Sequence, residues 1–349
     1  MRILILYTEL ADYVVNNFNV FLSQNPDAKM LVIHYPVNSE APFVFKKVTN
    51  ANFLVFQSDN WSTTLDTIHQ FNPNIILCSG WSNKHYLNLI KSIPNTTKRV
   101  LCFDNQWQGT IKQKILSTFS KWSFLKYFNM AWVAGEPQKE YALRLGFKEA
   151  NIFRGLYPAN EAVFSPIGKE KLENNQAFPK ILISIARYIP QKDLPTLWKA
   201  FIKVNQSLGN TWKLYSFGQG ELFNQRIEND YITHFGFVQP EQMKPYLLES
   251  GVYVLPSMYE PWGVAVHEMA LCAMPLVLSD KVGAATQFLT HQNGYSFKAG
   301  NALDLEQKLS LIMNLSDEAL WNMASYSYKL ASSSSPSIWS ETLLKIFKS

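Results

Sequence analysis

Two glutamates are candidates for ligand binding or catalysis. Their spacing would allow the start of one helix to position both. Glu260 and Glu268 lie in the segment 256–268, PSMYEPWGVAVHE, which directly follows a short apolar run. Proline disfavours helix before it and suits a helix start, so we expect a helix to begin near Trp262 or Gly263, with free N–H groups that face an anion. Both carboxylates could then accept hydrogen bonds from sugar hydroxyls. Alternatively, Glu260 only caps the helix and Glu268 is solvated.

Two cations precede this segment in positions that suit a phosphate group. Arg187 and Lys192 follow the apolar run 181–186 within the sequence SIARYIPQKD. Arg offers a bidentate fork and Lys a compact charge, and both match the concentrated negative charge of a diphosphate. The alternative is a pair of surface cations with little effect. Gly218 and Gly220 follow the next strand-like run, where they permit either close backbone approach to a ligand or only a tight turn.

Short apolar runs that read as strands alternate with helical segments along the chain. The expected strands are 2–7, 30–34, 53–56, 74–78, 99–103, 130–134, 181–186, 212–217, 252–255 and 276–279. This alternation predicts parallel sheets with helices on both faces, and such sheets bind ligands at the carboxyl ends of their strands. Gly263 and Gly283 follow two of these runs, which places them at that edge.

The length of 349 residues exceeds what one hydrophobic core usually serves, so two domains are expected. We predict an N-terminal domain over 1–165 and a C-terminal domain over 166–335, with a last helix over 336–349 that packs back on the first domain. The polar stretch Gly168–Pro179 contains no strand-like run and is the expected linker.

Composition excludes several classes of protein. With 47% hydrophobic and 17% charged residues, long disordered tails are not expected. No apolar run approaches the ~20 residues of a membrane span, and Glu9 and Asp12 come too early for a signal peptide, so we expect a cytoplasmic protein. Three cysteines and six histidines lack metal-ligand spacing, which predicts buried free thiols and no metal site. A net charge of +5 without a recognisable module does not indicate a nucleic-acid partner.

The excess positive charge lies entirely in the N-terminal half. Residues 1–160 hold 16 Lys and Arg against 10 Asp and Glu, whereas 161–349 hold 16 against 17. The segment 111–129 has no acid, several aromatic residues, and four lysines, Lys112, Lys114, Lys121 and Lys126. This composition suits an anionic membrane surface, and would make the protein peripheral on the inner face of a membrane. An ordinary helix with a solvated lysine face is the alternative.

The spacing of the two carboxylates resembles a known signature. After Glu268 the chain continues as MALCAMPLV, and the run from Glu260 resembles that of the retaining, nucleotide-sugar-dependent glycosyltransferases of family 4, of the glycosyl transferases group 1 and the GT-B fold. Arg187 and Lys192 look like the family's pair that holds the donor diphosphate. Further matches are GQG at 218–220, FGFV at 235–238 near the nucleobase, SDKVGA at 279–284 and NGYSF at 293–297.

The resemblance implies an α/β protein of GT-B type, with two Rossmann-like doubly wound domains facing a central cleft. It implies a retaining hexosyltransferase without metal or other cofactor, which moves a sugar from a UDP- or GDP-linked donor to a glycan or lipid-linked acceptor in surface polysaccharide or glycoconjugate synthesis. Arg187, Lys192 and Glu260 would be catalytic. The donor would be bound by Gly218, Gly220, Phe237, Val238, Gly263, Val264, Glu268 and Gly283.

The N-terminal part departs from the family pattern. Its first glycine is Gly80, so no glycine-rich loop follows the first strand, and Asp104 and Asn105 stand where relatives often have histidine. Asp104, Asn105 and His85 are the expected acceptor contacts. The departures leave a second hypothesis open, in which the protein is a non-catalytic glycosyltransferase-like partner or a sugar-nucleotide sensor.

Overall fold

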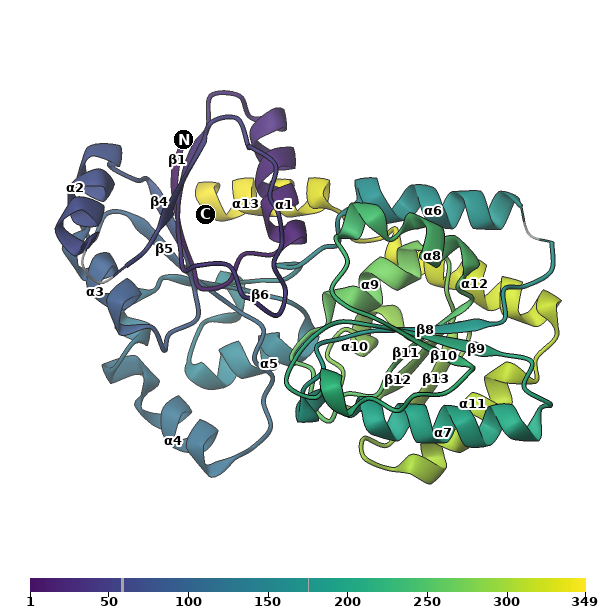
Figure 1. The fold of residues 1–349 in the computed structure, drawn as a ribbon. Helices are drawn as coiled ribbons and strands as arrows, with labels where there is room; N and C mark the ends of the chain where they lie inside the picture. Colours follow the sequence, from purple (N-terminus) through teal and green to yellow (C-terminus); the bar gives the residue numbers. More distant parts are fainter. Residues whose placement is uncertain (58–59, 175) are drawn as a thin grey trace. The chain divides into compact units, whose positions relative to one another are not determined.

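The computed structural model describes residues 1–57, 60–174 and 176–349, and the chain forms two compact units. The first unit comprises Met1–Asn38, Phe43–Pro158 and Pro336–Ser349, and the second comprises Ser39–Pro42 and Ala159–Ser335. Sequence analysis divides the chain after residue 165, whereas the two units divide after Pro158. Each unit is built on one twisted sheet with helices on both faces (Figure 1).

The sheet of the first unit has the strand order β3-β2-β1-β4-β5-β6-β7, and its paired strands are parallel. The strands are β1 (Arg2–Tyr7), β2 (Lys29–His34), β3 (Ala51–Val55), β4 (Ile75–Ser79), β5 (Lys98–Phe103), β6 (Met130–Val133) and β7 (Ile152–Phe153). Residues 3–6 of β1 are fully buried, because helices cover both faces. The strand order reverses between β1 and β4, which is where sheets of this type bind ligands.

The helices of the first unit pack on this sheet in two layers. They are α1 (Asp12–Gln24), α2 (Trp61–Phe71), α3 (Lys84–Ser92), α4 (Ile111–Phe119), α5 (Glu136–Leu145) and the chain's last helix, α13 (Pro336–Lys348). Figure 1 shows α13 beside α1. Trp339 of α13 stacks on Trp132 of β6, with 4.8 Å between ring centroids, and fills the core under this layer together with Phe18 and Phe21.

The sheet of the second unit has the order β10-β9-β8-β11-β12-β13 and is also parallel. The strands are β8 (Ile181–Ile185), β9 (Lys213–Phe217), β10 (Ile232–Phe235), β11 (Val252–Leu255), β12 (Leu276–Ser279) and β13 (Gly294–Phe297). The helices are α6 (Glu161–Glu173), α7 (Leu194–Ser207), α8 (Lys244–Glu249), α9 (Val264–Leu271), α10 (Ala285–Phe288), α11 (Ala302–Met313) and α12 (Asp317–Ala331). Here the order reverses between β8 and β11.

Three sequence-based expectations can be compared directly with these elements. The prediction of parallel sheets with helices on both faces is confirmed, as is that of three buried free cysteines. The linker predicted over Gly168–Pro179 is wrong, because the chain passes between the units at Pro158 and the first half of the predicted segment belongs to α6, which extends to Glu173. Pro166 lies inside that helix, and a proline followed by a polar run resembles a helix end in the sequence. In the described part of the chain, no helix is long and apolar enough to cross a bilayer.

Candidate functional site

Five loops of the second unit, after β8, β9, β10, β11 and β12, leave the carboxyl ends of neighbouring strands and are joined by backbone hydrogen bonds. The loop after β8 holds Arg187, and the glycine turn after β9 is bound to it, since Tyr188 donates to the Gln219 carbonyl at 2.8 Å. Tyr188 itself is buried, and its hydroxyl donates to Ser216 Oγ at 2.7 Å. Burial raises the pKa of Tyr188 to about 12, so the hydroxyl stays neutral and anchors the loop that carries Arg187.

The glycine turn can only be made of glycine. A Cβ atom on Gly218 would lie 2.0 Å from the Ala186 carbonyl oxygen, and one on Gly220 would lie 2.7 Å from that of Tyr188. Both residues also have positive φ angles, of 132° and 148°. The turn therefore requires glycine for a packing reason that holds without any ligand. The close approach leaves bare backbone at Gly218 and Gly220.

The segment after β11 is tied to the loops on either side of it. Met258 donates to the Gln191 carbonyl at 2.8 Å, which fixes it to the loop after β8. Glu260 donates from its backbone to the Lys281 carbonyl at 3.0 Å, and its own carbonyl accepts from Gly283 at 3.0 Å. Two residues predicted as separate parts of the site, Glu260 and Gly283, are thus directly hydrogen-bonded.

These ties bring Lys192 and Glu260 together as an ion pair. The two side chains are 11% and 13% exposed, so the pair lies largely out of water. Ser257, which is fully buried, also donates to the Glu260 carboxylate at 3.3 Å. A carboxylate held by a lysine and a hydroxyl in a partly dry site has a fixed direction, which suits it to orient a polar ligand.

Glu268 lies on the same helix start that Glu260 precedes. Helix α9 begins at Val264 after Gly263, whose φ of 92° and close contact with the Glu260 side chain again favour glycine. This start agrees with the predicted one. Burial raises the pKa of Tyr253 well above its usual value, and the nearby charges of Glu260 and Glu268 add to the effect, so both carboxylates lie around one tyrosine of β11.

Arg187 has a carboxylate partner that the sequence does not indicate. Its Nη1 lies 3.5 Å from Glu40 Oε2, and the two side chains are 44% and 34% exposed. Glu40 belongs to the short segment 39–42, which packs with the second unit although it is far from that unit in sequence. Gln239 also holds this segment, since its side-chain amide donates to the Pro42 carbonyl at 2.9 Å.

The predicted nucleobase residues, Phe237 and Val238, follow β10 in the same group of loops. Gly236 just before them accepts from the backbone N–H of Gly218 at 3.2 Å. The glycine turn therefore joins the loop of Arg187 on one side and this segment on the other. All the predicted donor-binding and catalytic residues lie on loops or a helix start at the carboxyl edge of the second sheet.

The first unit has a cavity of about 420 Å³ at the reversal point of its own sheet. It is lined by residues that follow β1, β4 and β5, among them Thr8, Trp81, Asp104 and Asn105. Two of the three predicted acceptor residues thus line one cavity. His85 is not among its lining residues, since its ring packs against Phe56 with 5.4 Å between centroids.

Two further contacts position the cavity wall. Gln138, at the start of α5 and fully buried, donates to the Asp104 carbonyl at 2.9 Å and accepts from the Gly135 N–H at 3.1 Å. The Tyr157 hydroxyl, in the wall itself, hydrogen-bonds to that of Tyr7, and burial raises the pKa of both tyrosines well above the usual value. Both phenols are therefore neutral hydrogen-bonding groups beside Asp104.

Sequence reasoning missed Ser257, Glu40 and Tyr157. Ser257 lies only three residues before Glu260, so its place beside a functional carboxylate could have been found from the strand end that precedes it. No sequence signal identifies Glu40, because it meets Arg187 across 147 residues.

Two doubly wound units of this kind define the GT-B class, and solved structures of that class match the whole chain. A glycosyltransferase from Rickettsia africae matches with a TM-score of 0.74 at 14% identity, over 99% of this chain and 98% of that one. Sucrose-phosphate synthase from Thermosynechococcus elongatus matches with a TM-score of 0.75 at 15% identity, over 100% and 98%. The Anabaena protein HepE, crystallised with UDP-glucose, matches with a TM-score of 0.74 at 14% identity, over 100% of this chain and 99% of that one. These likenesses confirm the predicted fold.

Sequence comparison gives the family. Residues 169–330 match the model of the Glycosyl transferases group 1. The N,N'-diacetylbacillosaminyl-diphospho-undecaprenol alpha-1,3-N-acetylgalactosaminyltransferase of Campylobacter jejuni is 25% identical over 307 residues, which are 84% of this chain and 78% of the relative. An uncharacterized glycosyltransferase of Methanocaldococcus jannaschii is 26% identical over 120 residues, which are 32% of this chain and 30% of that protein. Residues 169–330 therefore carry the match to the group 1 glycosyltransferases that the motifs of this part of the chain indicate.

Proposed function

We propose that this glycosyltransferase is a retaining, metal-independent enzyme of family 4 that moves a sugar from a UDP- or GDP-linked donor to a lipid-linked acceptor. The observation that carries the proposal is the buried Lys192–Glu260 pair at the carboxyl edge of the second sheet, with Arg187 on the same loop as Lys192. A nucleotide sugar needs both a cationic group for its diphosphate and a fixed carboxylate for its hydroxyls, and these three side chains supply them.

In this proposal the diphosphate lies against Arg187 and Lys192. Arg187 can give a bidentate contact to a phosphate, and Lys192 adds a point charge without any metal ion. The glycine turn at 218–220 lets backbone approach the ligand closely, and the N-terminus of α9 offers free N–H groups to a negative oxygen. Glu260 accepts hydrogen bonds from the transferred sugar, Glu268 from the ribose, and Phe237 and Val238 contact the base.

The transfer breaks the bond between the anomeric carbon and the diphosphate oxygen and forms one from that carbon to an acceptor hydroxyl on the same face. The acceptor proton passes to the departing phosphate oxygen, so charge and atoms balance without a covalent enzyme intermediate. Arg187 and Lys192 stabilise the leaving diphosphate, and Glu260 orients the sugar. Their contribution is alignment and fixed charge rather than nucleophilic attack.

The cavity beside Asp104 is the proposed acceptor pocket. Its carboxylate, amides and hydroxyls can accept and donate hydrogen bonds to sugar hydroxyls, and Trp81 gives an apolar wall. The Campylobacter relative is named for a transfer to an undecaprenol-diphosphate-linked sugar, which supports a lipid-linked acceptor here. Such transfers build glycoconjugates and surface polysaccharides.

The test is a transfer assay with purified protein, UDP- and GDP-hexoses, and a short-chain polyprenyl-diphosphate sugar, run in EDTA. We expect a new disaccharide on the acceptor, with the anomeric configuration of the donor by NMR. An inverted product would overturn the retaining mechanism, and a requirement for a divalent ion would overturn metal independence. Tight donor binding with no transfer to any acceptor would instead favour the sugar-nucleotide sensor.

A further inference from the structure

The segment that joins β5 to β6 leaves apolar side chains in water. Ile111, Ile115 and Phe119 recur every four residues along α4 and therefore share one helix face. They are 77%, 55% and 58% exposed, and Trp122 in the next turn is 70% exposed. No residue of α4 is fully buried. We call these four residues the apolar stripe.

A cationic pocket lies directly beside the apolar stripe. Lys121, Lys126 and Lys148 line a cavity of about 300 Å³ whose apolar floor includes Leu125 and Phe147. Lys121 immediately precedes Trp122 in the chain, so the pocket adjoins the stripe at this turn. All three lysines are exposed, and within the described residues none of them has a carboxylate partner. Three like charges around one hollow attract an anion.

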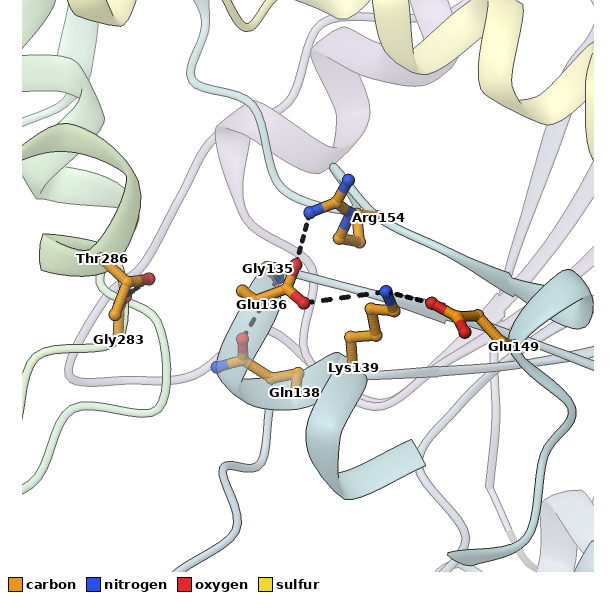
Figure 2. A network of polar contacts seen from close by, with 8 residues as sticks. All are labelled: Gly135, Glu136, Gln138, Lys139, Glu149, Arg154, Gly283 and Thr286. Carbon is orange, nitrogen blue, oxygen red and sulfur yellow. Dashed lines mark hydrogen bonds and ion pairs between the residues drawn. The ribbon is translucent and has the colours of Figure 1, made fainter. Parts of the chain in front are cut away.

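The acids nearby do not neutralise this pocket, because each is already paired. Figure 2 shows Glu136 between Arg154 and Lys139, and Lys139 in turn paired with Glu149. Lys139 Nζ lies 2.6 Å from Glu149 Oε1. Glu140 of α5 is paired with Arg144 at 2.8 Å. The positive charge of Lys121, Lys126 and Lys148 therefore remains uncompensated on this face of the first unit.

We propose that the apolar stripe and the cationic pocket together dock the first unit on an anionic lipid bilayer. Phe119, Trp122 and the two isoleucines would enter the headgroup region, and a lipid phosphate would lie in the pocket between Lys121, Lys126 and Lys148. Lys112 and Lys114, on either side of the stripe, add further charge toward the headgroups. This inference rests on the proposed function in one respect, since a lipid-linked acceptor has to be met at a membrane.

A bilayer fits this surface better than a protein partner does. A protein interface usually surrounds apolar anchors with mixed polar groups, whereas here every charged residue between 111 and 129 is a lysine. Aromatic and aliphatic side chains flanked by lysines are the composition of surface-bound membrane helices. Each lysine near an anionic surface strengthens binding about fivefold at low salt.

The experiment is vesicle sedimentation with the full chain, in the absence of donor and acceptor. Vesicles of phosphatidylcholine alone are compared with vesicles containing 30% phosphatidylglycerol, at low and high salt. The test variant carries Lys121→Gln, Lys126→Gln and Lys148→Gln. Its matched control carries Lys199→Gln, Lys213→Gln and Lys329→Gln, three exposed lysines of the second unit, so that both variants lose the same net charge. A second test variant carries both Phe119→Ser and Trp122→Ser in the apolar stripe. Its control carries both Leu303→Ser and Leu311→Ser, at exposed apolar positions of the second unit.

We expect salt-sensitive binding of the wild type to the anionic vesicles, loss of at least about tenfold in the pocket variant, a similar loss in the stripe variant, and wild-type binding by both controls. Inorganic phosphate at millimolar concentration should not prevent binding, because the apolar stripe contributes as well. No binding by the wild type, or equal losses in the pocket variant and its control, would overturn the proposal. Neither result depends on sugar transfer, so failure here is distinct from failure of the proposed function.

Discussion

Lys192 and Glu260 are separated by 68 residues, yet their side chains form an ion pair that is almost nine-tenths buried. The two loops are held side by side by two hydrogen bonds: the Met258 N–H donates to the Gln191 carbonyl, and the Gln191 side-chain amide donates to the Tyr259 carbonyl. The loops of the candidate site in the second unit are therefore held together by charge and hydrogen bonds within the chain itself.

The first prediction concerns the coupling within this pair. Lys192→Met leaves a carboxylate largely out of water without its cation, and Glu260→Gln leaves the lysine in the same position. We expect the double variant to lose less stability than the sum of the two single losses, with a coupling free energy of about 1–3 kcal/mol in a double-mutant cycle. Urea unfolding of the four proteins measures it. Additive losses would show that the pair is not energetically formed.

The second prediction concerns Glu40, which is paired with Arg187, the arginine proposed to bind the donor diphosphate. Releasing Arg187 from Glu40 removes an intramolecular competitor, so Glu40→Gln should lower the Kd of a nucleotide sugar. The pair is partly exposed, and such pairs are worth about 0.2–1 kcal/mol, so the affinity should rise by about 1.4-fold to fivefold. Glu173→Gln, which removes an equal charge from the exposed end of α6, is the control. Weaker binding by Glu40→Gln would mean that Glu40 helps to hold the donor.

The third prediction separates steric from conformational need at the glycine turn. Gly218→Ala places a methyl group against the Ala186 carbonyl, whereas Gly209→Ala, also at positive φ, meets nothing within 4 Å. Gly209→Ala should cost about 1 kcal/mol in unfolding free energy and leave donor binding unchanged. Gly218→Ala should cost clearly more and weaken donor binding. Equal effects of the two substitutions would contradict the close packing described here.

Much of the fold could be predicted because its strands are short, uninterrupted apolar runs. The runs over 252–255 and 276–279 agree with β11 and β12 to the residue. Strand β7 has only two residues and too little pattern to be found, and β10 carries the polar Thr233 and His234. The start of α9 was predicted correctly because proline and glycine restrict or permit backbone conformations at their own positions. Such local effects can be predicted from a single sequence.

For the candidate site, too, some features could be predicted from the sequence and others could not. Lys192, Glu260 and the glycines follow strand ends, so their shared edge could be expected from the parallel topology. The hydrogen bond from Gln138 to the Asp104 carbonyl and the pairing of Arg187 with Glu40 could not, because each joins segments whose approach depends on tertiary packing. Their residue types also have many other uses on protein surfaces.

The fourth prediction concerns His267 of α9, which links the two ends of the second unit. Its ring accepts from the Ala159 N–H at 3.0 Å and donates to the Ala331 carbonyl at 3.0 Å. Burial lowers the pKa of His267 to about 4, against about 6.5 in the unfolded chain. As the pH falls through 6.5, His267 becomes protonated in the unfolded state but stays neutral in the folded state. The free energy of unfolding therefore decreases until about pH 4.

This decline should amount to about 3 kcal/mol from His267 alone. Urea unfolding at pH 4.5, 5.5, 6.5 and 7.5 measures it. In His267→Gln the stability at pH 7.5 should be lower, because one amide cannot replace both ring contacts, but the decline between pH 6.5 and 4.5 should be much smaller. His291→Gln, at an exposed position, should keep the wild-type slope. An unchanged slope in His267→Gln would assign the acid sensitivity to other groups.

The most direct test of the central claim is calorimetric titration of UDP- and GDP-hexoses into the wild type, Arg187→Ala and Lys192→Ala, with Lys199→Ala as the control on the exposed face of α7. We predict saturable binding of one nucleotide sugar by the wild type and by the control, and a loss of at least about tenfold in affinity for each of the other two variants with the fold intact by circular dichroism. Wild-type affinity in both Arg187→Ala and Lys192→Ala would contradict the account, because the donor diphosphate would then be bound elsewhere.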